Sequence, residues 1–331
     1  MQSPRQTQTY LRNLFARHGI APRHRYGQNF LVDLNIHDLI VKSAEVGPGD
    51  VVLEVGPGAG ALTTQMAATG AAVVAVDIDP GMAMLTTEAT VIYPNVRVLH
   101  VDALKGKNKL NPKVLDNIKA GLAVAPDRRF KLVANLPYNA ATPIIGNLLV
   151  HPEIRIERMV VTIQLELAQR MLAPPDSDDY GALSVLVQAL SDASLVRTLP
   201  PSVFWPRPSV DSAVLMIVPN EAKRAEVGDV AWFHTVVRTI FLHRRKNLRR
   251  VLYSHWRDRW TKEEVDTILE GIGLTGLVRA EAMTVDQHIT LAKALRARIG
   301  PDAPTDDEDE GEDEDGEEES EDADEDDADE E

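Results

Sequence analysis

Between residues 50 and 173, short apolar runs alternate with amphipathic segments. Five of the runs are typical of buried strands: DVVLEVG (50–56), AAVVAVDID (71–79), VRVLHVDAL (96–104), FKLVANL (130–136) and MVVTIQ (159–164). Helical segments follow several of them, such as ALTTQMAATG, PGMAMLTTEAT and LELAQRMLA. Strands that alternate with helices in this way predict a doubly wound parallel α/β sheet with helices on both faces.

The alternation stops after SAVLMIVP (212–219), and residues 229–300 have helical periodicity only. The basic segment 105–129 is expected to be partly helical, and it is long for a connection between a strand and the next strand, so we treat it as an insertion. The sequence therefore predicts an N-terminal extension (1–24), an α/β domain (25–222), a small all-helical domain (223–300) and an acidic tail (301–331).

The formal charge of −16 is located almost entirely in the tail, because residues 306–331 contain 21 Asp and Glu and no Lys or Arg. The remainder has 35 basic and 30 acidic residues, a mildly basic body that favours a polyanionic partner. The tail has almost no apolar residues and repels itself, so we expect it to be disordered.

The chain has no cysteine, which excludes disulfides, thiolate metal sites and cysteine nucleophiles. Its nine histidines have no metal-ligand spacing, so no metal site is expected. No apolar stretch reaches the ~18 residues that a membrane span requires, and the N-terminus lacks the apolar core of a signal peptide. We expect a monomer in the cytoplasm with no membrane contact.

A glycine-rich turn follows the first predicted strand in VLEVGPGAG. Gly56 and Gly58 would let the backbone approach a ligand, Asp77 ends the next strand and Asp102 ends the third. Asp77 is suited to ribose hydroxyls and Asp102 to an adenine amino group. The pattern favours S-adenosylmethionine, but a dinucleotide site or a tight turn without a ligand satisfies it as well.

The fourth predicted strand ends in NLPY, at the edge of the sheet where ligands bind. The side chain of Asn135 and the carbonyl of Leu136 offer acceptors for an exocyclic amine, Pro137 stiffens the turn, and Tyr138 offers a stacking surface. Such a site would act mainly by holding a weakly nucleophilic amine in line with a methyl donor. The alternative is a capping asparagine followed by a proline turn.

The chain resembles the small-subunit (16S) ribosomal RNA adenine dimethyltransferases over about residues 25–298, apart from 105–129. The resemblance rests on segments in the family's order: RYGQNFLVD (25–33), VLEVGPGAGALT (52–63), VDID (76–79), VDAL (101–104), NLPYN (135–139), DYGALSVLVQ (179–188), VFWPRPSVDSAV (203–214), FLHRRKNL (241–248) and RAEAMTVDQHITLAKAL (279–295). It implies a Rossmann-like class I methyltransferase domain joined to the helical domain.

By this resemblance, the protein would use S-adenosyl-L-methionine to methylate two adjacent adenines, twice each, in a hairpin near the 3′ end of small-subunit rRNA. The residues implied to contact the cofactor are Asn29, Leu31, Gly56, Gly58, Asp77, Asp102 and Asn135. Residues 135–138 would form the target pocket, with Phe204 holding the flipped adenine against Tyr138. Two positions depart from the family, since Asp77 stands where Glu is usual and Leu165 where a basic residue is common.

A cluster of cations in HRRKNLRR (243–250) lies on a predicted helix, and its expected role is to neutralise RNA phosphates. The residues predicted to bind RNA are Arg23, Arg25, Arg244, Arg245, Lys246, Arg249 and Arg250. A solvated helix face is the alternative. The expected partner is the rRNA of an immature small subunit. The alternatives are an assembly factor for which methylation is secondary, and an enzyme acting on large-subunit rRNA.

Overall fold

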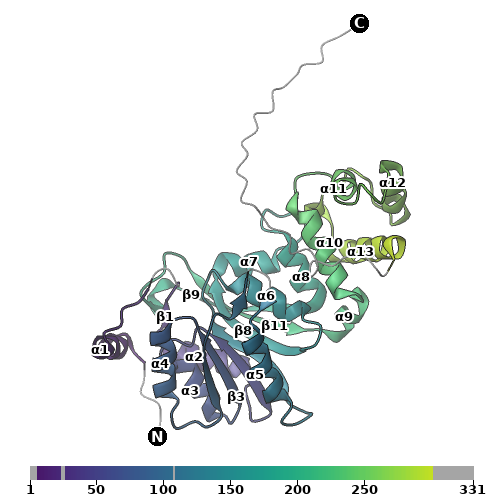
Figure 1. The fold of residues 1–331 in the computed structure, drawn as a ribbon. Helices are drawn as coiled ribbons and strands as arrows, with labels where there is room; N and C mark the ends of the chain where they lie inside the picture. The colour runs from purple at the N-terminus through teal and green to yellow at the C-terminus, as the bar shows by residue number, and fades with distance from the viewer. Residues whose placement is uncertain (1–5, 24–26, 107–108, 301–331) are drawn as a thin grey trace.

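The computed structural model describes residues 6–23, 27–106 and 109–300. Arg25 and the acidic tail lie outside these ranges. The centre of the molecule is a seven-stranded sheet in the order β4-β3-β2-β7-β8-β11-β9 (Figure 1). Its strands are β2 (Asp50–Val55), β3 (Ala72–Asp77), β4 (Val96–His100), β7 (Arg129–Asn135), β8 (Ile156–Gln164), β9 (Ser191–Leu199) and β11 (Ser212–Pro219). The first five in this order are parallel, and β11 runs antiparallel to both of its neighbours.

The five predicted strands are all present, with bounds that shift by a few residues. β9 has no counterpart among them. It is an edge strand whose segment, SDASLVRTL, buries only its two terminal residues, so it lacks the continuous apolar run of an internal strand.

Alternate residues of the central strands enter two separate cores. On β2, Val52 packs beneath α2 (Leu34–Ser43) and α3 (Ala61–Ala68), whereas Val51 and Leu53 face the opposite layer. That layer contains α6 (Ala141–Val150), α7 (Leu165–Leu172) and α8 (Ala182–Leu190). This two-residue period is the reason why a strand buried on both faces is apolar throughout.

Segment 105–129 contains most of the crossover between β4 and β7. Beyond the short strands β5 (Leu104–Lys105) and β6 (Lys109–Leu110), Asn111 caps the helix α5 (Pro112–Leu122) and Pro112 occupies its first turn. Val114 and Ile118 are fully buried and the helix packs against β2 and β3. The segment, although basic, therefore supplies one of the helices that cover the sheet.

The N-terminal residues also form a helix, α1 (Gln8–His18), which ends at Gly19 in the left-handed conformation. Its apolar face packs against Ala59 and Met82, so it lies beside the glycine-rich turn. Between α1 and the sheet, β1 (Phe30–Leu31) pairs with β10 (Phe204–Trp205). Further along the chain, β3 is followed by α4 (Pro80–Ala89), whose first turn is capped by Asp79.

The C-terminal domain is helical, as predicted, and comprises α9 (Glu221–Val227), α10 (Val230–Leu242), α11 (Leu248–His255), α12 (Lys262–Gly271) and α13 (Val285–Ile299). Trp232 and Trp256 are buried in it, with ring centroids 5.9 Å apart. α8 packs against α10 and α13, and a single apolar cluster extends from the sheet into this domain. Among the described residues, no helix has the length and apolar character needed to cross a membrane.

The prediction that 243–250 lies on one helix is wrong. α10 ends at Leu242, residues 243–246 form a turn, and Asn247 caps α11 by accepting a hydrogen bond from the backbone N–H of Arg250. Asparagine favours this capping position over a helix interior, and a backbone bridge from Asn247 to Arg279 fixes the turn. The basic residues therefore lie partly on this turn and partly in the first turn of α11.

Candidate active site

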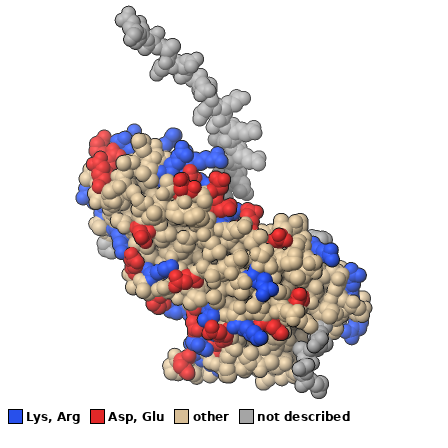
Figure 2. All heavy atoms as spheres, turned by 180° about the vertical axis from the view of Figure 1, so that it is seen from behind, with Lys and Arg blue, Asp and Glu red and all other residues tan. Residues whose placement is uncertain are grey.

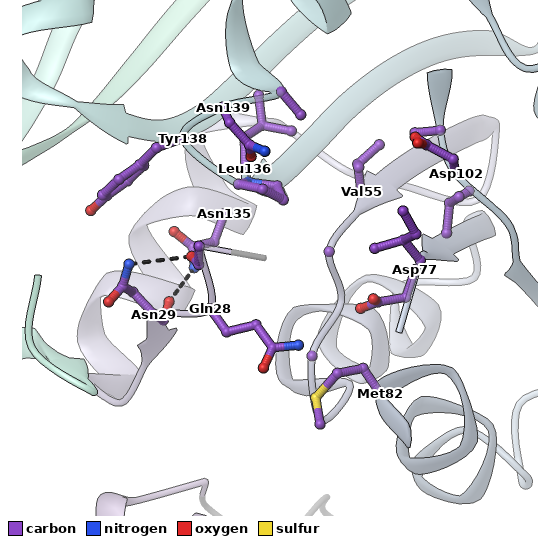
Figure 3. Close-up of a pocket in the computed structure, with 18 of the residues that line it drawn as sticks. Gln28, Asn29, Val55, Asp77, Met82, Asp102, Asn135, Leu136, Tyr138 and Asn139 are labelled. Carbon is purple, nitrogen blue, oxygen red and sulfur yellow. Dashed lines mark hydrogen bonds between the residues drawn. The ribbon is translucent and has the colours of Figure 1, made fainter. Parts of the chain in front are cut away.

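A cavity of about 210 Å³ opens at the carboxyl ends of β2, β3, β4 and β7. Its lining comes from five segments that are distant in sequence, within residues 27–30, 55–58, 76–78, 101–104 and 135–140, together with Met82 of α4. Figure 3 shows Asp77 and Asp102 on one side of this cavity and Asn135 and Tyr138 on the other. Apart from Leu31, the predicted cofactor residues thus share one pocket with the NLPY turn.

The glycine-rich turn leaves room that any side chain would remove. Gly56 and Gly58 have φ angles of +74° and +60°, a region that other residues rarely adopt. A Cβ atom on Gly58 would stand 2.9 Å from the ring of Phe30, and one on Gly56 would stand 3.3 Å from Pro137. A bare backbone cradle of this kind fits a ligand that approaches the main chain closely, as the methionine part of S-adenosylmethionine requires.

Two carboxylates, those of Asp77 and Asp102, line the same cavity as the glycine-rich turn. Asp77 is buried, and its Oδ1 accepts the backbone N–H of Asp79 at 2.9 Å. Burial raises the pKa of Asp77 to about 6, against the lowering effect of the Asp79 and Gly58 backbone N–H groups. Asp102 is exposed and accepts from the backbone N–H of Leu104. Ile78, which also lines the cavity, is 44% exposed and offers an apolar surface suited to an adenine ring.

Asn135 is oriented by a residue from a distant part of the chain. Its Nδ2 donates to the backbone carbonyl of Asn29 at 2.8 Å (Figure 3). A carbonyl can only accept, so the amide nitrogen must face Asn29, and Oδ1 remains an acceptor for the pocket. The backbone N–H of Leu136 is bonded to Thr162 on β8, which fixes the start of the turn. The arrangement is suited to accepting hydrogen bonds from the N–H groups of an amine.

Tyr138 is anchored at its hydroxyl. Its Oη lies 2.7 Å from Oγ of Ser212, a fully buried residue at the start of β11. Burial raises the pKa of the Tyr138 phenol, an effect that the Ser212 hydrogen bond partly opposes, so the hydroxyl stays protonated at neutral pH. The ring is thereby held between β7 and β11 as a half-buried platform. Sequence reasoning did not assign this role to Ser212, although the VDS segment was recognised.

Two predicted site residues are not brought to the pocket. Leu31 and Phe204 are 5% and 2% exposed, pair with each other across β1 and β10, and belong to the core beneath α2. Neither lines the cavity among the described residues. Their apolar side chains gain more from this core than from the pocket. The stacking of an adenine between Phe204 and Tyr138 stays a prediction.

The predicted RNA-binding cations fall into two groups. Arg244 forms an ion pair with Glu281 at 3.0 Å, Arg249 with Asp266 at 2.6 Å, and Arg23 with Asp79 at 3.5 Å. In contrast, Arg245, Lys246 and Arg250 are exposed and form no ion pair with another described residue. Lys and Arg are interspersed with Asp and Glu on the face that Figure 2 shows, so this face is not uniformly basic.

A buried acid beneath the glycine-rich turn leads to a prediction about stability. Glu54 on β2 is buried, accepts from Oγ1 of Thr63 at 2.6 Å, and has a pKa raised by desolvation from 4.5 to about 8. Because the folded pKa exceeds the unfolded one, the contribution of Glu54 is complete below pH 4.5 and is lost as the pH rises to 8.

Glu54→Gln keeps an acceptor for Thr63 and removes the titration. We expect its gain in unfolding free energy over the wild type to grow between pH 5 and pH 8, to on the order of 3 kcal/mol. Urea unfolding at the two pH values measures this difference. Equal differences at both would show that Glu54 is ionised in the folded protein.

The sheet order, the single reversed strand β11 and a glycine-rich cradle with acids at the next strand ends define a class I methyltransferase. Comparison with known proteins gives the family. The profile of the ribosomal RNA adenine dimethylase family matches residues 20–296, and the chain belongs to this family.

Similar curated proteins include two named ribosomal RNA small subunit methyltransferase A. The one from Moorella thermoacetica is 38% identical over 84% of this chain and 94% of its own length. The one from Ligilactobacillus salivarius is 39% identical over 87% of this chain and 94% of its own.

Similar solved structures include a dimethyladenosine transferase from Plasmodium falciparum, with a TM-score of 0.65 and 23% identity over 81% of this chain and 97% of that one. The 23S rRNA methyltransferase ErmE has a TM-score of 0.53 and 25% identity over 81% and 99%. The predicted fold class, S-adenosylmethionine as cofactor and rRNA adenine methylation as the activity are confirmed by this membership.

Proposed function

We propose that this protein dimethylates the 6-amino groups of two adjacent adenines in the 3′-terminal hairpin of small-subunit rRNA, late in ribosome biogenesis. The observation that carries the proposal is the orientation of Asn135, whose nitrogen is occupied by the Asn29 carbonyl so that its oxygen faces the pocket. The small subunit, rather than the large one, is supported by the names of relatives 38% and 39% identical.

Different residues of the pocket bind different parts of the cofactor. Gly56 and Gly58 let the main chain approach the cofactor, while Asp77 accepts from its ribose hydroxyls and Asp102 from its adenine amino group. Asn29 and Asn135, which are hydrogen-bonded to each other and line the same cavity, would also contact the cofactor. S-adenosylmethionine, when bound, supplies an electrophilic methyl group.

On the target side, positioning is the main catalytic contribution. An extruded adenine would stack on the ring of Tyr138. The two N–H groups of its amine would donate hydrogen bonds to Oδ1 of Asn135 and to the Leu136 carbonyl. Fixing the amine in line with the methyl donor lowers the entropic part of the barrier. The methylated amine then loses a proton readily, so the pocket needs no strong base.

RNA contact is assigned to the helical domain. Arg245, Lys246 and Arg250 are exposed on it, and each neutralised phosphate would release counterions. Arg25, outside the described residues, keeps its predicted RNA contact. We propose that the chain acts as a monomer in the cytoplasm on immature small subunits.

The test uses the purified full-length protein with labelled S-adenosylmethionine and unmethylated small subunits. We expect labelling at two adjacent adenines of the 3′-terminal hairpin, located by arrest of primer extension, and none on large subunits offered in parallel. Labelling of large-subunit rRNA with inactive small subunits would overturn the proposal. The absence of both in a protein that binds the cofactor would instead support a binding role.

A further inference from the structure

We propose that Arg244 is a positioning residue that locks the helical domain onto the methyltransferase domain, and that it does not bind an rRNA phosphate. The inference rests on the proposed function, because it concerns how rRNA is presented to the pocket. It divides the basic segment into one cation that sets geometry and neighbours that contact RNA.

The guanidinium of Arg244 spans the two domains. Nε donates to Oε2 of Glu281 at 3.0 Å, and Nη1 and Nη2 both donate to the backbone carbonyl of Asp178 at 3.1 Å. Glu281 belongs to the helical domain, whereas Asp178 lies in the loop between α7 and α8. All three guanidinium nitrogens thus donate to protein acceptors, a geometry that arginine provides and lysine does not.

The loop that Arg244 holds is fixed at further points. The backbone N–H of Asp176 donates to the carbonyl of Glu281 at 2.8 Å. At the end of the loop, Tyr180 is fully buried, with its ring 6.1 Å from that of Phe241 and 6.3 Å from that of His288. Hydrogen bonds and aromatic packing therefore converge where the two domains meet.

This contact is linked through α7 to the carboxyl edge of the sheet, where the pocket lies. α7 begins at Leu165, immediately after β8 reaches the carboxyl edge of the sheet, and the clamped loop follows α7. On the other side, Arg245 and Lys246 are exposed on the same turn as Arg244. Fixing Arg244 against the loop thus sets the direction in which its neighbours meet a substrate bound at the pocket.

Lysine replacement separates the two possible roles of Arg244. A phosphate contact survives in Arg244→Lys because the charge is kept, whereas the two-acceptor clamp is lost. We expect Arg244→Lys and Arg244→Ala to lower kcat/KM for small subunits by about tenfold each. The cofactor Kd and the salt dependence of RNA binding should stay at wild-type values.

Arg245 provides the matched control on the same turn. Arg245→Ala, which removes a proposed phosphate contact, should reduce the slope of log K against log salt by about 1. If instead Arg244→Lys behaves like the wild type and Arg244→Ala reduces the salt slope, Arg244 is a phosphate contact and the proposal is wrong.

Replacing Glu281, the acid that pairs with Arg244, has opposite expected effects if Arg244 is a clamp and if it is a phosphate contact. Removing a negative charge beside an RNA-binding surface should tighten RNA binding, but losing the clamp should lower kcat/KM. We expect Glu281→Ala to lower kcat/KM and the double variant with Arg244→Ala to lose no more than either single one. Glu270→Ala removes an exposed acid of the same domain that pairs with no described residue, and serves as the charge control.

The clamp can also be tested without RNA. In urea unfolding, Arg244→Ala and Glu281→Ala should be less than additive in the double variant. Tighter RNA binding by Glu281→Ala, or full additivity in both assays, would overturn the clamp. Inactivity of the wild type on small subunits would overturn the proposed function while leaving the unfolding result as evidence for the clamp.

Discussion

Replacing Asn135 by alanine is expected to lower kcat for methyl transfer by ~10³, the usual effect of removing a preorganised polar group from a transition state. The nucleophilic amine acquires positive charge as it is methylated, and the amide oxygen faces that charge only because Asn29 holds the nitrogen. The acceptor is worth more in the transition state than in the ground state, so the loss falls on kcat rather than on KM.

Asn135→Asp is the sharper variant. A carboxylate has no N–H for the carbonyl of Asn29, so one of its oxygens would face another acceptor at 2.8 Å. We therefore expect Asp to fail to rescue activity, although it offers acceptors to the amine. Asn147→Ala, which removes an amide bonded only to Pro143 within α6, is the control. Single-turnover methylation within tenfold of the wild type for Asn135→Asp would contradict this orientation.

Asp77→Asn weakens cofactor binding by ~10–100-fold, the effect of losing a charge-assisted hydrogen bond. The amide oxygen keeps an acceptor for the backbone N–H of Asp79, so the turn should keep its shape. What is lost is the second acceptor and the negative charge that face the pocket.

The same variant should change the pH dependence of binding. With a pKa of about 6, Asp77 becomes protonated below that pH and can no longer accept from two hydroxyls. Cofactor affinity of the wild type should therefore fall from pH 7 to pH 5, while that of Asp77→Asn stays level. Calorimetry across this range measures both, and parallel profiles would remove Asp77 from the ribose contact.

Much of the fold followed from local pattern. The runs of β2, β3 and β7 are buried on both faces, and that burial is why their sequences are mostly apolar. The position of NLPY after β7 was predictable for the same reason. β9 was not predicted because an exposed edge strand can be polar, and α5 was not recognised as a crossover helix because its basic residues mask its apolar face.

Contacts between residues distant in the chain could not be predicted from the sequence. Asn135 and Asn29 are 106 positions apart, and Tyr138 and Ser212 are 74 apart. Neither pairing has a local signal, because each depends on which strand ends the fold brings together. Arg244 illustrates the same limit, since composition identifies a cation but not the carboxylate that it meets.

The apolar cluster shared by the sheet and the helical domain has a consequence for folding. Removing α10 and α13 would expose the α8 surface on which they pack, and a domain that loses part of its core loses most of its marginal stability. The two domains should therefore unfold as one cooperative unit. A destabilising substitution among the C-terminal helices would then lower the population of intact methyl-transfer sites, even though it lies far from them.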